Sequence, residues 1–350
     1  LEALQHLTNG MKAIERLPKK DPVRELQMVA HLAVPMVLTR GWANEDVGAA
    51  YRRAYDLAKS LGQPPELFPT LVGILSYYLV RGEFAHAYTL AHENYGIAER
   101  SGDPELILEA AHDRGTCSLY MGKFDEASRF LGQAAEIFDP ARHAHHAFLY
   151  SKLAGPSAMA HQLLIQAVRG DREGAKAVAE RSLADAEAGN HAFSRLWVLT
   201  GLCVAHIIFG DHEALAQVSA RQIAESQELG FPNWLAQGFV WSGSAQAALG
   251  DVEPGIALIR QGLGIWQMTG AELMKPFMLT RLAEALLIAG RLDEAEATYG
   301  QVVSTMDATG EIWAAPDSHR LGAEIARRRL GKDHASVASR VQLAREMAKR

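Results

Sequence analysis

"YMGKFDEASRF", residues Tyr120–Phe130, contains a sequence pattern that recurs along the whole chain. Apolar residues lead into a glycine, and a short turn, an acidic residue and an alanine follow. Related stretches are "LVRGEFAHA" at Leu79–Ala87, "AALGDVEPG" at Ala247–Gly255 and "LIAGRLDEA" at Leu287–Ala295. A pattern repeated this often indicates a repeating structural unit rather than the chemistry of one active site.

The glycines of these turns recur with a nearly constant spacing. Most neighbours in the series are 40 residues apart, and one interval is 48. The series is Gly41, Gly82, Gly122, Gly170, Gly210, Gly250 and Gly290. A second series lies between them: Gly62, Gly102, Gly189, Gly230, Gly270 and Gly310. A fixed period of this length is typical of stacked supersecondary units.

Each unit has the pattern of two helices. In Leu279–Leu287 the apolar residues recur at the i, i+3, i+4 spacing of one buried helical stripe, and Leu292–Met306 repeats this spacing after Gly290. A glycine suits such a turn because a Cβ in left-handed conformation costs about 1 kcal/mol. Trp197–Gly210 is rich in β-branched residues, but it is longer than a typical strand and keeps the period, so a helix is favoured.

We therefore predict an all-α, TPR-like α-solenoid: a superhelix of about eight antiparallel helix pairs, preceded by a leading helix over 1–17. Small residues before and after the turns, such as Gly115, Gly243, Ala127 and Ala295, resemble those of tetratricopeptide repeats, although the unit is about 40 residues rather than 34. The chain is predicted to be one domain, 1–350, with an insertion at 140–152. The predicted repeats are 24–62, 64–102, 104–139, 153–189, 191–230, 232–270, 272–310 and 312–350.

The composition narrows the class of protein. A net charge of −6 over 350 residues argues against a nucleic-acid partner, which needs a concentrated basic face. Neither a signal peptide nor a run of 18 apolar residues is evident, so we expect a cytoplasmic protein without a membrane partner. Cys117 and Cys203 have no disulfide or zinc spacing. Because the first residue is Leu1 and not Met, we expect the chain to be a piece of a longer protein.

Motifs for catalysis and cofactor binding are missing. There is no phosphate-binding loop, G-x-S-x-G elbow, G-x-G-x-x-G or EF-hand loop, and "HENYG" at His92–Gly96 has Gly where a zincin helix needs its second histidine. We therefore predict no enzyme activity, no cofactor and no metal in these residues. The longer interval holds His143, His145 and His146. A structural or solvated insertion is favoured there, and a transition-metal or anion site is the open alternative.

Several stretches together resemble one family. The resemblance is carried by Gly41–Ala91, Asp139–Tyr150, Leu229–Asp251, Thr269–Ala295 and Thr309–Ile325. They are similar to the C-terminal TPR-like region of large bacterial signalling proteins that couple a class III adenylate/guanylate cyclase domain to an AAA-type ATPase. The resemblance implies that the ATPase and cyclase domains lie N-terminal to this region in the same polypeptide. No catalytic residue can be carried over, because the family's catalytic motifs are absent here.

The expected function is therefore that of a non-catalytic sensor and interaction module in signal transduction. It would bind a protein, a peptide or a small effector in its concave groove and regulate the attached cyclase and ATPase domains. The main alternative is a sensor or oligomerisation domain of a large ATPase-containing transcriptional activator. An enzyme with its site in the groove and a pure scaffold are further alternatives.

Groove residues are expected where the repeats differ from one another. The position nine residues before each turn glycine varies in chemistry, as do its neighbours one helical turn away. The expected anchors are Trp197, Trp241 and Arg281; the alternative for the two tryptophans is that they fill the core between pairs. The full set of candidate groove residues is Glu109, Asp113, Trp197, Gln237, Trp241, Arg281 and Glu284.

Overall fold

The computed structural model describes residues 6, 9–10, 21–62 and 65–348, and the regular structure within them is entirely helical. Eight antiparallel pairs follow one another: α2 (Pro22–Arg40) with α3 (Glu45–Ser60), α4 (Leu67–Val80) with α5 (Phe84–Ser101), α6 (Pro104–Tyr120) with α7 (Phe124–Ile137), α9 (Ala154–Arg169) with α10 (Arg172–Ala188), α11 (Ala192–Phe209) with α12 (His212–Leu229), α13 (Pro232–Leu249) with α14 (Val252–Met268), α15 (Lys275–Ile288) with α16 (Leu292–Thr309), and α17 (Ala315–Leu330) with α18 (Ala335–Met347).

The predicted all-α, TPR-like fold is confirmed. The leading helix predicted over 1–17 lies outside the described residues, except for residues 6, 9 and 10. The insertion between α7 and α9 contains a short helix of its own, α8 (His146–Tyr150), which the sequence pattern did not indicate.

The turn glycines adopt the conformation that their spacing predicts. Every glycine of the first series has a positive φ, between 72° and 111°. Gly189, from the second series, is the exception: its φ is −73°, and Asn190 takes the left-handed conformation instead. A Cβ on Gly189 would lie 2.6 Å from Leu153 Cδ1, so close packing explains this glycine.

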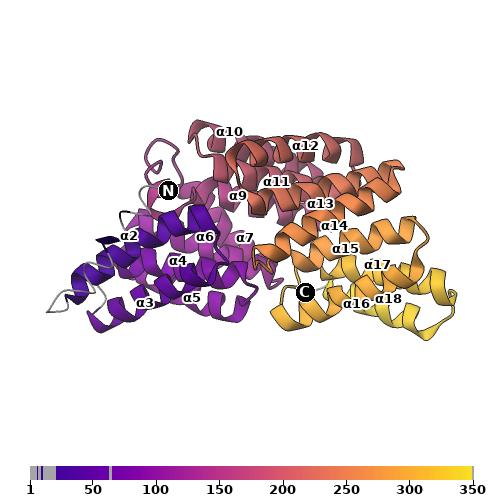
Figure 1. Ribbon diagram of the computed structural model, residues 1–350, viewed down its shortest axis with the longest axis horizontal. Helices are drawn as coiled ribbons and strands as arrows, with labels where there is room; N and C mark the ends of the chain where they lie inside the picture. The colour runs from indigo at the N-terminus through magenta and orange to yellow at the C-terminus, as the bar shows by residue number, and fades with distance from the viewer. Residues whose placement is uncertain (1–5, 7–8, 11–20, 63–64, 349–350) are drawn as a thin grey trace.

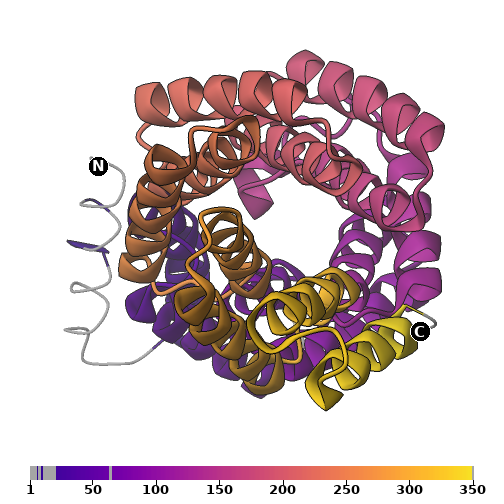
Figure 2. The ribbon, with the colours of Figure 1, turned by 90° about the vertical axis from the view of Figure 1, so that its right-hand side faces the viewer.

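The pairs wind into a superhelix with an inner and an outer layer of helices, as Figure 2 shows. From α4–α5 onward, the first helix of each pair supplies most of the buried residues, and the second helix presents more exposed ones. The stretch Trp197–Gly210 is helical up to Phe209, the last residue of α11, and Gly210 caps this helix, so the helix predicted there is confirmed. Among the described residues, α11 is also the one helix long and apolar enough to cross a membrane, but half of it is buried and it packs between α9, α12 and α13.

The superhelix closes on itself, because its last pairs pack on its first ones (Figures 1 and 2). The backbone N–H groups of Glu272 and Leu273 donate to the carbonyl of Val80, at 2.9 Å and 3.1 Å. Ile312 N–H donates in the same way to the carbonyl of Tyr120, at 2.9 Å. We call this contact, between the α4–α5 and α6–α7 turns and the α14–α15 and α16–α17 loops, the seam.

Candidate functional site

A pocket of about 200 Å³ opens on the inner side of the superhelix. The end of α2 and the α12–α13 loop meet at its rim, where the space beside Gly41 is limited by Asn233. Helices α4, α6, α9, α11 and α13 supply most of its wall, and the end of the insertion supplies Ser151 and Lys152. The pocket therefore joins the first pair of helices, at the start of the superhelix, to α13 and the α12–α13 loop, which lie almost one revolution later.

Aromatic side chains form one wall of the pocket. They include Trp42, Phe193, Trp197, Trp234 and Trp266. The ring centroids of Phe193 and Trp234 are 5.1 Å apart, and those of Trp197 and Trp234 are 4.9 Å apart, both edge-to-face. Such a wall offers a large apolar surface to a ligand and holds its own shape through ring–ring contacts.

A buried ion pair also lines the pocket. Lys152 Nζ is 2.6 Å from Asp113 Oδ1, and His112 Nδ1 is 3.0 Å from the same oxygen. Burial acts to raise the pKa of Asp113, but Lys152 and His112 outweigh it and hold that pKa below its usual range. Burial and the charge of Lys152 lower the pKa of His112. At neutral pH the wall thus carries a carboxylate beside a neutral imidazole, and Lys152 is paired with that carboxylate.

Several polar atoms of the pocket residues lack a partner. Asp113 Oδ2, Ser151 Oγ and Trp266 Nε1 are buried without a hydrogen bond. Trp197 Nε1 lies 3.3 Å from His161 Nδ1, but that nitrogen is 2.7 Å from the carbonyl of Ser157 and donates its proton there. Unpaired buried groups cost about 1–3 kcal/mol each, so a ligand that pairs with them gains affinity.

The structure separates the predicted groove residues into four groups. Asp113, Trp197 and Gln237 line the pocket, and Gln237 accepts a hydrogen bond from Thr200 at 2.9 Å. Glu109 lies one turn before Asp113 on α6 and is fully buried against His146, 2.7 Å away. Asp113, Trp197 and Gln237 thus lie on the pocket side of α6, α11 and α13, whereas Glu109 does not reach the pocket. The part of these residues in ligand binding stays a prediction.

Arg281 and Glu284 lie at a second, smaller cavity between α13 and α15, which Ser244 also lines. Arg281 Nη1 is 2.8 Å from Glu284 Oε2, and Arg281 also pairs with Asp317. The arginine is only 4% exposed, so its charge is already matched by two carboxylates. Arg281 is thus placed as a buried ion-pair residue rather than as an open anchor.

Trp241 is fully buried, in the position of a core residue. Its ring contacts Phe277 with centroids 5.7 Å apart, and Phe277 in turn contacts Trp313 at 5.0 Å. Trp313 reaches Tyr120 across the seam, at 6.3 Å. This placement agrees with the alternative that Trp241 fills the core between pairs, whereas Trp197 is half-buried at the pocket.

Sequence reasoning missed much of the pocket. Trp42, Trp234 and Trp266 do not share one repeat position, and Lys152 and Ser151 belong to the insertion. A comparison of repeats could not find them, because it compares residues at equal positions. Ser151 and Lys152 come from the insertion, and Trp234 meets Phe193 and Trp197 of the preceding pair at positions that differ from repeat to repeat.

Comparison with known proteins gives a fold and one sequence relative. No family model matches the chain. An uncharacterized protein of Rhizobium meliloti (strain 1021) is 23% identical over 356 residues, which cover 99% of this chain and 34% of that protein. The chain therefore spans about a third of the length of this relative.

Among solved structures, the Rap protein complexed with Competence and Sporulation Factor superposes with a TM-score of 0.63 at 11% identity, over 93% of this chain and 88% of that one. Aspartyl phosphate phosphatase F from Bacillus subtilis has a TM-score of 0.48 at 10% identity, over 93% and 94%. A STAND protein with a tetratricopeptide repeat sensor from Pyrococcus horikoshii has a TM-score of 0.43 at 12% identity, over 87% and 50%. The likeness to the Rap protein shows that this chain shares its helical-repeat fold.

Proposed function

We propose that this chain is a non-catalytic sensor module that binds a short peptide in the pocket between the two turns of the superhelix. The observation that carries the proposal is the combination of an aromatic wall with unpaired polar atoms on buried residues. Asp113 Oδ2 calls for a donor, Trp266 Nε1 calls for an acceptor, and Ser151 Oγ can serve as either. A peptide backbone carries both kinds of group, and its side chains can cover the aromatic wall.

The same geometry speaks against catalysis. Lys152 and His112 lower the pKa of Asp113 and hold it as a carboxylate, so Asp113 is not a proton donor near neutral pH. The Rap protein, which has the same fold, was solved in complex with Competence and Sporulation Factor, and this supports a binding role for such a superhelix.

The sensor would act on attached domains in a cytoplasmic signalling protein. The resemblance in sequence proposes an ATPase and a nucleotide cyclase for these domains, and the greater length of the Rhizobium relative supports further domains beside this fold in such proteins. Because the pocket is built from both turns, a bound peptide would hold the two turns together. A change in their spacing is the signal that we propose for the attached domains.

Intrinsic fluorescence tests the pocket, since it holds four of the six tryptophans. The probe is a library of peptides of three to six residues, with a set of cationic metabolites as a second arm. We expect saturable quenching by some peptides, weakened at least tenfold by Phe193→Ala. The matched control is Phe209→Ala, a half-buried phenylalanine of α11 that stacks on Arg172 away from the pocket.

Equal binding to the wild type and to Phe193→Ala would place the ligand elsewhere and refute the pocket. Binding by metabolites alone would keep the pocket but overturn the peptide as its ligand. If neither arm quenches the fluorescence, the proposal of a binding site is wrong.

A further inference from the structure

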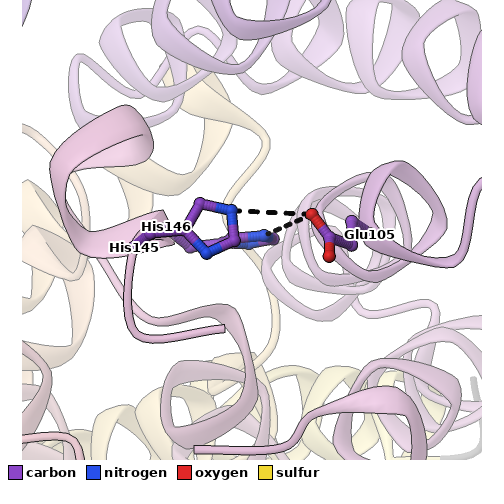
Figure 3. A group of neighbouring side chains, drawn as sticks. All are labelled: Glu105, His145 and His146. Atoms are coloured by element: carbon purple, nitrogen blue, oxygen red, sulfur yellow. Dashed lines mark ion pairs between the residues drawn. The ribbon is translucent and has the colours of Figure 1, made fainter. Parts of the chain in front are cut away.

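Three side chains that could bind a metal converge beside the insertion, as Figure 3 shows. The Nε2 atoms of His145 and His146 lie 3.5 Å and 3.6 Å from Oε2 of Glu105. All three donor atoms lie within 4.8 Å of one another. The two separations are long for hydrogen bonds. They are close to the distance between ligands around a tetrahedral ion, about 3.4 Å for bonds of about 2.0–2.1 Å.

Both imidazoles turn Nε2 toward Glu105 and use Nδ1 for a different partner. Nδ1 of His146 is 2.7 Å from Oε1 of Glu109, and Nδ1 of His145 is 3.2 Å from the backbone carbonyl of Arg142. A carboxylate and a carbonyl only accept, so each Nδ1 carries a proton, and Nε2 is the ring atom that each histidine turns toward Glu105. Metal-binding histidines are oriented in this way, by a carboxylate or carbonyl on the other ring nitrogen.

We propose that Glu105, His145 and His146 bind one Zn²⁺ ion. Two imidazoles and one carboxylate form a ligand set that zinc uses, with a fourth position left for water or another ligand. Magnesium and calcium prefer oxygen ligands alone, so the two histidines disfavour them. Glu105 keeps an oxygen for the ion, because its neighbour Arg142 approaches the other one, Oε1, at 3.6 Å.

An ion can reach the site from solvent, and the residues behind the site are buried. The side chain of His145 is half exposed, whereas those of His146 and Glu109 are buried. Glu109 Oε2 has no partner in the core, so its contact with His146 is the interaction that holds this carboxylate. An ion would fasten the insertion to α6. The insertion ends in Ser151 and Lys152 at the pocket, so zinc would also fix one edge of the pocket, although the zinc site stands independently of the peptide proposal.

Zinc binding by the full chain tests the proposal directly. The tag-free protein is stripped with a chelator and titrated with Zn²⁺ in competition with a chromophoric chelator. We expect one ion per chain, with affinity lowered at least tenfold in His145→Ala and in Glu105→Gln. The control His92→Ala removes an exposed histidine of α5 and should keep wild-type affinity.

Two further measurements separate a ligand from a structural residue. Glu109→Gln keeps the shape of the side chain but weakens the acceptor on His146, so we expect roughly a tenfold loss of affinity. Zinc should raise the melting temperature of the wild type and of His92→Ala but not of His145→Ala, which alters only a half-exposed side chain. Absence of binding at micromolar zinc, or equal affinity in the wild type, His145→Ala and Glu105→Gln, overturns the proposal.

Discussion

Glu311, in the loop between α16 and α17, is a carboxyl buried at the seam. Its two oxygens accept from Trp313 Nε1 at 2.8 Å and from the backbone N–H of Met274 at 2.9 Å. Burial nevertheless dominates and raises the pKa of Glu311 to about 8. The burial of Glu311 could not be predicted from the sequence, because a glutamate beside a helix start normally lies in water.

The raised pKa predicts a pH dependence of stability. The folded state holds the proton of Glu311 more tightly than the unfolded state, whose pKa is about 4.3. The stabilising contribution is therefore complete below about pH 4 and is lost as the pH rises toward the folded pKa of about 8. We expect Glu311→Gln to lose less stability than the wild type between pH 5 and pH 8.

Urea unfolding at several pH values measures this difference. The matched control is Glu228→Gln, an exposed glutamate of α12, which should follow the wild type. Parallel curves for Glu311→Gln and the wild type would show that Glu311 does not keep its proton in the folded protein.

At the scale of helices, glycines permit the closest contacts. A Cβ on Gly243 of α13 would lie 2.5 Å from the carbonyl oxygen of Gly255 on α14, and a Cβ on Gly262 would lie 2.5 Å from that of Ala236. Such distances leave no room for a methyl group, and the clash would be with backbone. These two helices therefore approach each other through glycine at several points along their length.

Two glycines of α14 test this packing. Gly262→Ala must push α13 and α14 apart, so we expect a loss of about 2 kcal/mol in the free energy of unfolding. Gly264→Ala, two residues on, meets no atom within 4 Å and should gain about 0.5–1 kcal/mol from helix propensity. Both lie inside the same helix, so the propensity term cancels in the comparison. Equal melting temperatures for the two variants would contradict the close approach.

The sequence could predict helices because their signals are local. Turn glycines and apolar stripes depend on neighbours within a few residues, which is why the helix pairs and the positive φ of the first glycine series were predictable. The histidines of the insertion were visible too, but their carboxylate partner Glu105 stands about 40 residues earlier on α6. No spacing rule joins ligands from separate units, so the sequence could not complete that site.

At the scale of the whole molecule, the winding of the superhelix determines which residues from distant repeats come into contact. A solenoid is usually described by contacts between adjacent repeats alone, and the period predicts no more than that. Here the small rotation from each pair to the next brings α14–α17 back onto α4–α7. The contact of Trp313 with Tyr120 is one consequence, because these residues belong to pairs that are far apart in the chain.

The seam predicts that distant turns share their stability. Ile312 is half-buried against Gly122, where a Cβ would lie 3.1 Å from its Cγ1. Ile312→Asp would place a charge in this contact, at a cost of about 1–3 kcal/mol. Hydrogen exchange should then quicken at the amides of Gly122 and Lys123, which bond to Leu119 and Ser118 in the α6–α7 turn.

A control away from the seam separates coupling from general destabilisation. Ile288→Asp changes an exposed isoleucine at the end of α15, away from the seam, and should leave the exchange of Gly122 and Lys123 unchanged. If Ile312→Asp quickens exchange only in its own loop, the α16–α17 loop and the α6–α7 turn are in contact but do not share their stability. If it quickens exchange in both, the closed superhelix unfolds as one unit, because the free energy of the seam is then common to repeats far apart in the chain.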